Sequence, residues 1–181
     1  MSTAAEKFQR WAAAELGLNN ASIVKELSGG NSNLTQLVVH DQGQLVIRSA
    51  PAKTISPKAH LGVKREATFM SALAFHAPVP KVLCWCDDIE ILGYPFALIE
   101  YIDGVAITEA LPACYDNTES LNSIGLQLAS ALGEIACAPW QELGLADMGK
   151  PDNFLRRQIE RWLKVRDSQP TRALPEIQRI G

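Results

Sequence analysis

The chain has 181 residues and a mass of 19.8 kDa, which is enough for one domain of ordinary size or for a small domain and part of another. Hydrophobic residues make up 47% and charged residues 20%, so the chain can bury a core and is not expected to be disordered. A net charge of −3 offers no basic surface, which argues against nucleic-acid binding.

The sequence has no sign of a membrane or secreted protein. No apolar run reaches the roughly 20 residues that a membrane-spanning helix needs, and residues 1–7 lack the basic start and apolar stretch of a signal peptide. The four cysteines, Cys84, Cys86, Cys114 and Cys137, do not have the spacing of a zinc site. We therefore expect a soluble cytoplasmic protein with free, buried thiols and no metal ligands.

The first fifty residues predict a helix followed by an antiparallel meander. Apolar residues recur at helical spacing over residues 3–16, and Gly17 follows as a stop signal. Strands are predicted at residues 23–27, 34–40 and 45–48. A glycine-containing turn joins the first two strands, and Asp41-Gln42-Gly43 makes a tight turn between the second and the third.

The next fifty residues predict a helix and further strands. A helix is expected over residues 58–74, and the proline-rich segment 77–80 ends it. Its inward-facing residues are predicted to be Leu61, Phe69 and Leu73, with Val63 and Met70 as further candidates. A strand is expected at 82–85, with Ile91-Leu92 beyond the acidic turn Asp87-Asp88, and a second strand at 96–102.

After Gly104 the pattern becomes helical. A long helix is predicted over 119–136, a second one opens at Pro151-Asp152, and residues 176–180 begin a further turn. The apolar stripe of the long helix comprises Leu121, Ile124, Leu128, Leu132 and Ile135, and Trp140 and Trp162 are assigned to the core. A sheet-rich half before a helical half predicts an α+β fold of two lobes, residues 1–103 and 104–181.

The turn at residues 28–33 is a candidate phosphate site. Its residues are Ser28, Gly29, Gly30, Asn31, Ser32 and Asn33. The two glycines allow positive φ and leave no Cβ in the way, so that backbone N–H groups could approach a phosphate. Arg48, at the end of the third strand, can bind phosphate or carboxylate in a fork. An ordinary hairpin explains the same glycines equally simply.

The order of these segments and their amino-acid sequences resemble those of the aminoglycoside phosphotransferase family, which has a protein-kinase-like fold. The likeness covers nearly the whole chain and, within the family, points to the kinase-like domains also found fused ahead of some acyl-CoA dehydrogenases. Three segments carry it: Leu-Ser-Gly-Gly-Asn-Ser-Asn-Leu-Thr at 27–35, Leu-Gly-Tyr-Pro-Phe-Ala-Leu-Ile-Glu-Tyr-Ile-Asp-Gly at 92–104, and Gly-Leu-Ala-Asp-Met-Gly-Lys-Pro-Asp-Asn-Phe-Leu-Arg-Arg-Gln-Ile-Glu-Arg-Trp at 144–162.

The resemblance implies an ATP-binding small lobe, with the turn 28–33 over the phosphates. Arg48 would stand where kinases have a lysine on their third strand, and Glu66 would pair with it and direct it to the α- and β-phosphates. From the residues alone, Glu66 fits equally well as a surface partner of Lys64 or Arg65. The strand 97–101, including Glu100, and its exit through Ile102 would offer backbone groups to adenine. Val46 and Leu98 would be apolar walls.

The chemical half of the family's site has no counterpart in these 181 residues. The family takes its catalytic and Mg²⁺-binding groups from a His-Gly-Asp-type loop and a later aspartate, and no His-Gly-Asp or His-x-Asp occurs here. The resemblance therefore implies a truncated phosphotransferase of a small hydroxyl-bearing substrate that is inactive as this chain. The alternative is a non-catalytic nucleotide-binding or protein-interaction module, self-associating through exposed apolar helix faces.

One further motif imitates a phosphate-binding loop. Residues 144–151 fit seven of the eight positions of a Walker A loop, but a proline replaces the Ser/Thr that would bind Mg²⁺, and no apolar strand precedes Gly144. Asp147-Met148-Gly149 similarly imitates the metal-binding Asp-Phe-Gly of kinases without a catalytic loop upstream. We interpret both as an ordinary loop.

Overall fold

The structure is a computed structural model that describes residues 2–27, 33–51, 59–107, 110–150 and 152–168. The chain divides into two compact units, residues 1–144 and 145–181. Several predicted segments lie outside the described residues: the turn at 28–33 except for Asn33, the first residue of the helix at 58–74, Pro151, and the helical turn at 176–180.

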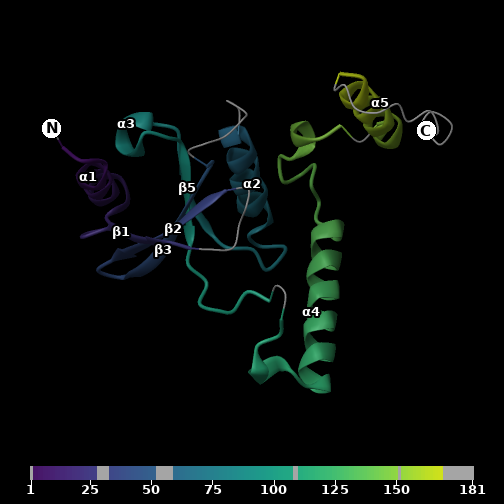
Figure 1. Cartoon of the computed structure of the whole chain (residues 1–181), viewed down its shortest axis with the longest axis horizontal. Helices are drawn as coiled ribbons and strands as arrows, with labels where there is room; N and C mark the ends of the chain where they lie inside the picture. The colour runs from purple at the N-terminus through teal and green to yellow at the C-terminus, as the bar shows by residue number, and fades with distance from the viewer. Residues whose placement is uncertain (1, 28–32, 52–58, 108–109, 151, 169–181) are drawn as a thin grey trace. The chain divides into compact units, whose positions relative to one another are not determined.

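A five-stranded antiparallel sheet forms the centre of the first unit (Figure 1). The strand order is β1-β2-β3-β5-β4. The strands are β1 (Ser22–Glu26), β2 (Leu34–His40), β3 (Gly43–Ser49), β4 (Val82–Cys86) and β5 (Phe96–Glu100). His40 lies opposite Gly43, so Asp41 and Gln42 form a two-residue hairpin loop, and Gly43 adopts a φ of 149° that side chains disfavour. The predicted α+β fold with about five antiparallel strands is confirmed.

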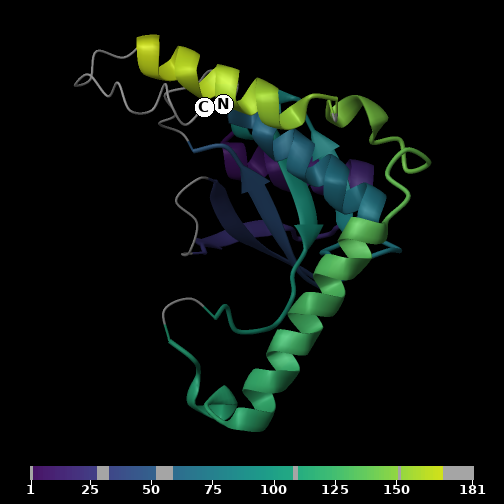
Figure 2. The ribbon, with the colours of Figure 1, turned by 90° about the vertical axis from the view of Figure 1, so that its right-hand side faces the viewer.

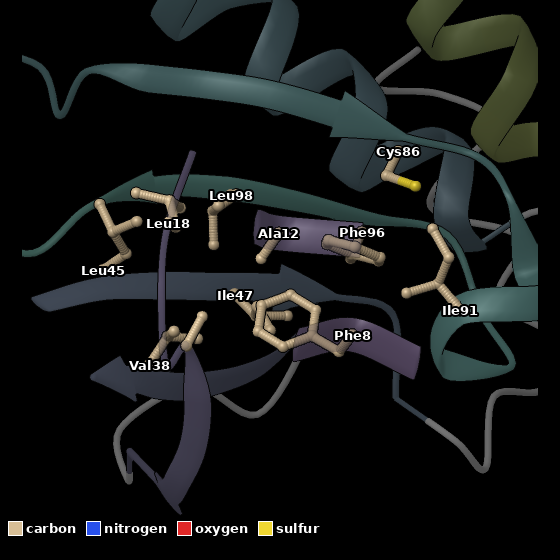
Figure 3. Packing of buried hydrophobic residues seen from close by; sticks show 11 residues of the cluster. Phe8, Ala12, Leu18, Val38, Leu45, Ile47, Cys86, Ile91, Phe96 and Leu98 are labelled. Carbon is tan, nitrogen blue, oxygen red and sulfur yellow. The ribbon is translucent and has the colours of Figure 1, made fainter. Parts of the chain in front are cut away.

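Helix α1 (Ala4–Leu16) covers one face of the sheet (Figure 1). Thr3 and Glu6 form a reciprocal capping box at its start, and Gly17 ends it with a left-handed φ of 67°. Phe8 and Ala12 are fully buried against Ile47, Phe96 and other strand residues, a cluster that we call the α1-side core (Figure 3). The helix predicted over residues 3–16 from its apolar spacing is confirmed.

Helix α2 (Ala59–Leu73) packs on the opposite face of the sheet. Its buried residues are Val63, Ala67 and Leu73, and the first two join Val46, Ala97 and Ile99 in what we call the α2-side core. The prediction that Leu61 faces inward is wrong, because 49% of its surface is exposed. Residues 61 and 63 lie about 200° apart around a helix, so burial of Val63 turns Leu61 to solvent.

The connection between β4 and β5 differs from the predicted pattern. Residues Ile89–Leu92 form a short helix, α3, instead of an extended flank of the acidic turn. The Asp88 side chain caps it by accepting a hydrogen bond from the Glu90 N–H, and Gly93 ends it with a φ of 87°. Ile91 is thereby buried in the α1-side core, so an apolar pair that resembled a strand edge is a helical turn.

The segments after residue 104 are helical, as predicted. Helix α4 (Thr118–Cys137) is one uninterrupted helix (Figure 2), and α5 (Phe154–Ser168) lies in the second unit. Two short 3-10 turns, η1 (Ala113–Tyr115) and η2 (Ala146–Met148), precede them. The Walker-like segment is a turn, and the described element directly before it is helix α4 rather than a strand. No described helix combines the length and apolar character that crossing a membrane requires.

These later helices bury little. Helix α4 has no buried residue, and the exposed apolar faces predicted for both helices are confirmed. The assignment of the two tryptophans to the core is wrong, since Trp140 is 40% and Trp162 is 64% exposed. The predicted division into lobes at residues 103 and 104 stays a prediction.

Candidate functional site

An ion pair between Arg48 and Glu66 joins β3 to α2. Arg48 lies opposite Thr35 on β2 and Ala97 on β5. Because Ala97 belongs to the α2-side core, the same row of the sheet turns the Arg48 side chain toward α2. The Nε atom of Arg48 is 2.8 Å from Oε1 of Glu66. The pair that the sequence resemblance implied is therefore present.

The pair lies at the edge of the core. The side chains of Arg48 and Glu66 are 31% and 35% exposed, so each is partly shielded and still reachable from solvent. The Arg48 Nε atom itself is shielded and makes no hydrogen bond of good angular geometry, so the 2.8 Å contact is principally ionic. Nε is the guanidinium nitrogen nearest the backbone. The contact with Glu66 therefore uses Nε and not the two terminal nitrogens of the guanidinium.

Asn33 holds the other oxygen of the same carboxylate. Its side-chain Nδ2 donates a hydrogen bond of 3.1 Å to Oε2 of Glu66, in a partly buried position. Sequence reasoning placed Asn33 over the phosphates and missed this contact. A contact between residues 33 positions apart leaves no signal in a single sequence.

The alternative partners of Glu66 are engaged elsewhere. Lys64 lies with its Nζ 5.7 Å from the centroid of the Trp85 ring, and the Arg65 guanidinium lies 5.4 Å from the ring of Phe69. Such contacts between cations and aromatic faces are mildly attractive. Among the described residues, the ion-pair partner of Glu66 is Arg48 and neither of its basic neighbours on the helix.

The two predicted apolar walls lie on opposite faces of the sheet. Val46 lies opposite Ile99 in the α2-side core, on the same face as Arg48. Leu98 lies opposite Ile47 in the α1-side core and is fully buried. Because side chains alternate along a strand, Leu98 cannot line the same site as Val46, and this prediction is wrong.

Of the remaining predicted nucleotide-binding residues, the structure describes Glu100 and Ile102. The N–H of Glu100 donates to the carbonyl of Lys81 at 2.8 Å, and its carboxylate accepts from the Lys81 N–H at 3.1 Å, so this N–H is already engaged. Ile102 follows the strand and is 58% exposed. Ser28, Gly29, Gly30, Asn31 and Ser32 lie outside the described residues.

A shallow depression of about 420 Å³ lies beside the far end of α2. It is lined by Ser71, Ala74, Phe75, Val79, Lys81, Val82 and Glu100. Neither Arg48 nor Glu66 contributes to it, and it holds one carboxylate and one ammonium group. The depression is therefore separate from the Arg48–Glu66 pair.

The described residues do not assemble a metal site. No group of three or more His, Cys, Asp or Glu side chains lies together in the described parts of the chain. Burial is the main cause that raises the pKa of the Cys84 thiol to about 11, and the nearby Cys86 raises it further. All four cysteines are free, but Cys114 and Cys137 are exposed and Cys84 is only partly buried, so the prediction of buried thiols holds fully only for Cys86.

Comparison with known proteins identifies the class. Residues 23–180 match the phosphotransferase enzyme family APH, and the chain belongs to that family. In structure it resembles a candidate aminoglycoside phosphotransferase from Ralstonia eutropha JMP134, with a TM-score of 0.76 and 27% identity over 94% of this chain and 49% of that one. The kinase-like phosphotransferase fold that the sequence predicted is thereby shown.

Among curated proteins, the chain is similar to parts of larger acyl-CoA dehydrogenase family members. It is 33% identical to member 10 of Mus musculus over 83% of this chain and 14% of that protein. It is 27% identical to member 11 of Gallus gallus over 87% of this chain and 20% of that protein. The chain thus spans a seventh to a fifth of these relatives and about half of the solved one, and the predicted likeness to this subgroup is confirmed.

Proposed function

We propose that this chain provides the ATP-binding lobe of a kinase that phosphorylates a hydroxyl group of a small molecule. The observation that carries the proposal is the Arg48–Glu66 ion pair on the open edge of the α2-side core. In phosphoryl transfer a fixed cation neutralises phosphate oxygens, and a carboxylate beside it limits the rotamers that the cation samples. The Arg48 side chain, 31% exposed, remains reachable for that task.

The proposal assigns the nucleotide to residues 1–103. Arg48 would contact the α- and β-phosphates, with Ser28, Gly29, Gly30, Asn31 and Ser32 near them, and Val46 would supply an apolar wall on the same face of the sheet. Backbone groups near Ile102 would meet the adenine, because the Glu100 N–H is engaged within the sheet. Residues 104–181 would belong to the helical lobe that contacts the acceptor.

Mg²⁺ has no fitting ligand set in the described residues. Phosphoryl transfer also needs a group that orients the attacking hydroxyl, and the 181 residues hold no His-Gly-Asp or His-x-Asp. We therefore expect these residues by themselves to bind nucleotide without transferring its phosphoryl group. ATP supplies the transferable phosphoryl when bound, and the chain's own residues bind and orient it.

A thermal-shift measurement with ATP, in the presence and absence of Mg²⁺, tests the proposal. ATP at about ten times its Kd should raise the Tm of the wild-type chain by about 4 °C. Arg48→Ala should reduce this rise to below about 1 °C, whereas Arg48→Lys should retain part of it because a cation remains. No rise in the wild-type chain, or an equal rise in Arg48→Ala, contradicts nucleotide binding through Arg48.

The second unit offers a matched control for this measurement. Arg156 and Glu160 form an ion pair between the same atom types, Nε and Oε1, at 3.1 Å, with side chains 81% and 53% exposed. Arg156→Ala removes the same charge from the chain without touching β3 or α2. It should retain the full rise in Tm with ATP.

A second candidate function is that of a protein-interaction module. The exposed apolar residues of α4 and α5 favour it, because contiguous exposed apolar surface commonly marks an interaction site. Under this hypothesis the wild-type chain would show no response to ATP and would self-associate. The thermal-shift measurement with ATP, together with sedimentation velocity as a measure of self-association, therefore separates the two functions.

A further inference from the structure

The carboxylate of Glu66 is held at both oxygens by residues of two neighbouring strand segments. Oε1 faces Arg48 Nε at 2.8 Å, and Oε2 accepts the hydrogen bond from Asn33 Nδ2 at 3.1 Å. Asn33 directly precedes β2 and lies two residues before Thr35, which stands opposite Arg48 in the β2–β3 register. Side chains two residues apart along an extended chain point to the same face. This placement brings Asn33 and Arg48 to one carboxylate.

Two-point attachment restricts a side chain that is otherwise mobile. A glutamate has three rotatable bonds, and a single contact leaves its carboxylate able to turn, so a second contact removes rotamer freedom. Asn33 supplies a neutral donor, so it fixes the carboxylate without neutralising the charge that Arg48 needs.

We propose that Asn33 is a positioning residue, which holds Glu66 toward Arg48 and acts on a bound triphosphate only through that pair. The inference deepens the proposed function and rests on it for its nucleotide readout. It differs from the sequence-based expectation, in which Asn33 touches the phosphates itself. The difference is measurable, because a residue that acts through Glu66 has no effect once Glu66 is removed.

The first test is a double-mutant cycle on ATP affinity, measured by isothermal titration calorimetry of the whole chain. Asn33→Ala should weaken ATP binding about fivefold and Glu66→Ala about tenfold, as expected for hydrogen bonds and contacts involving a charged group. The double variant should bind within about twofold of Glu66→Ala alone. If the double variant loses the product of the two factors, Asn33 acts independently of Glu66, and the inference is overturned.

Asn20 provides the matched control for a general loss of folding. Its Nδ2 donates to both carboxylate oxygens of Asp41, at 2.9 and 3.1 Å, in the same unit and outside the candidate site. Asn20→Ala removes an amide-to-carboxylate contact of the same kind. It should lower the urea midpoint and leave the ATP affinity unchanged within about twofold. An ATP loss equal to that of Asn33→Ala would overturn the inference.

A second cycle needs no nucleotide and separates failure of the inference from failure of the proposed function. It measures the urea midpoint of Asn33→Ala, Arg48→Ala and the double variant without ligand. If Asn33 positions Glu66 toward Arg48, Asn33→Ala should lower the urea midpoint at most half as much in a chain that already carries Arg48→Ala as in the wild-type chain. Asn33 and Arg48 need not touch each other for this coupling. Equal losses in both backgrounds would overturn the inference. If the wild-type chain does not bind ATP, the proposed function fails and this cycle alone decides the role of Asn33.

Discussion

Helices α1 and α4 have similar sequence features, but only the apolar stripe of α1 is buried. Both have a side-chain N-cap, from Thr3 in α1 and from Asn117 in α4, and both carry an apolar stripe at helical spacing. In α1 the stripe is covered, with Phe8 and Ala12 fully buried in the α1-side core. In α4 no residue is buried.

The apolar stripe of α4 remains largely in solvent. Leu128 is 61% exposed and Leu132 is 58% exposed, whereas the core side chains of the sheet are at most 9% exposed. Helical spacing therefore predicts that a face will be apolar but does not say which surface covers it. Both cores draw mainly on residues before residue 100, so the stability of the described chain should reside there.

The largest expected effect comes from truncating the aromatic centre of the α1-side core. Phe96 is fully buried, with its ring centroid 6.0 Å from that of Phe8 and 5.3 Å from that of Trp11. Phe96→Ala should lower the free energy of unfolding by about 3–5 kcal/mol, because it removes buried area and leaves a cavity. Urea unfolding followed by tryptophan fluorescence measures this loss.

Leu128→Ala is the matching truncation on α4. Because most of the Leu128 side chain is exposed, it should cost less than about 0.5 kcal/mol in the same urea experiment. Similar losses for Phe96→Ala and Leu128→Ala would show that α4 is covered in solution. That result would remove the contrast between the two regions.

The next effect concerns the pH dependence of the sheet core. Burial raises the pKa of Cys84 in the folded chain to about 11 from an ordinary value of 9.0. A raised folded-state pKa contributes stability that is complete below about pH 9 and is lost as the pH rises toward 11. Wild-type unfolding free energy should therefore fall about 1–2 kcal/mol more than that of Cys84→Ala across this window.

Cys114→Ala is the control for this titration, because Cys114 is exposed in the same unit. Its unfolding free energy, measured in urea from pH 8 to 11, should follow that of the wild-type chain. A wild-type slope equal to that of Cys84→Ala would show that the Cys84 thiolate is as well solvated when folded as when unfolded.

The smallest effect on stability, with a clear effect on assembly, is expected on α4. The predicted self-association through exposed helix faces requires apolar contact, so a charge at Leu128 should oppose it. Leu128→Glu should shift sedimentation-velocity profiles toward the monomer while changing the unfolding free energy by less than about 0.5 kcal/mol. An unchanged distribution of species would argue that α4 is not the contact surface.

Sequence reasoning predicted the strands, turns and helix ends more completely than it predicted which side chains are buried. The hairpin at Asp41-Gln42 and the helix stop at Gly17 were predicted correctly, because each depends on local turn or cap chemistry. The short helix at Ile89–Leu92 was missed, since a one-turn helix has no periodicity to detect. The burial of Trp140 and Trp162 was predicted wrongly, because burial depends on a covering surface that composition does not specify.

The candidate site was predicted through its family resemblance and its ion pair. The pairing of Arg48 with Glu66 is present, although the residues alone allowed Lys64 or Arg65 equally well. The placement of Leu98 beside Val46 failed, because the register between β3 and β5 sets which side chains share a face, and a single sequence does not reveal it. The Asn33 contact needed coordinates, since it joins the start of β2 to the middle of α2.

The most direct test of the account is an NMR titration of the arginine Nε–H signals with ATP. The Nε of Arg48 is shielded from solvent, which favours its observation, and the variant Arg48→Lys assigns the signal. The account predicts a saturable shift of that signal with ATP and little shift with adenosine, which lacks phosphates. An Arg48 signal that stays in place at saturating ATP would contradict the claim that this guanidinium binds the nucleotide phosphates.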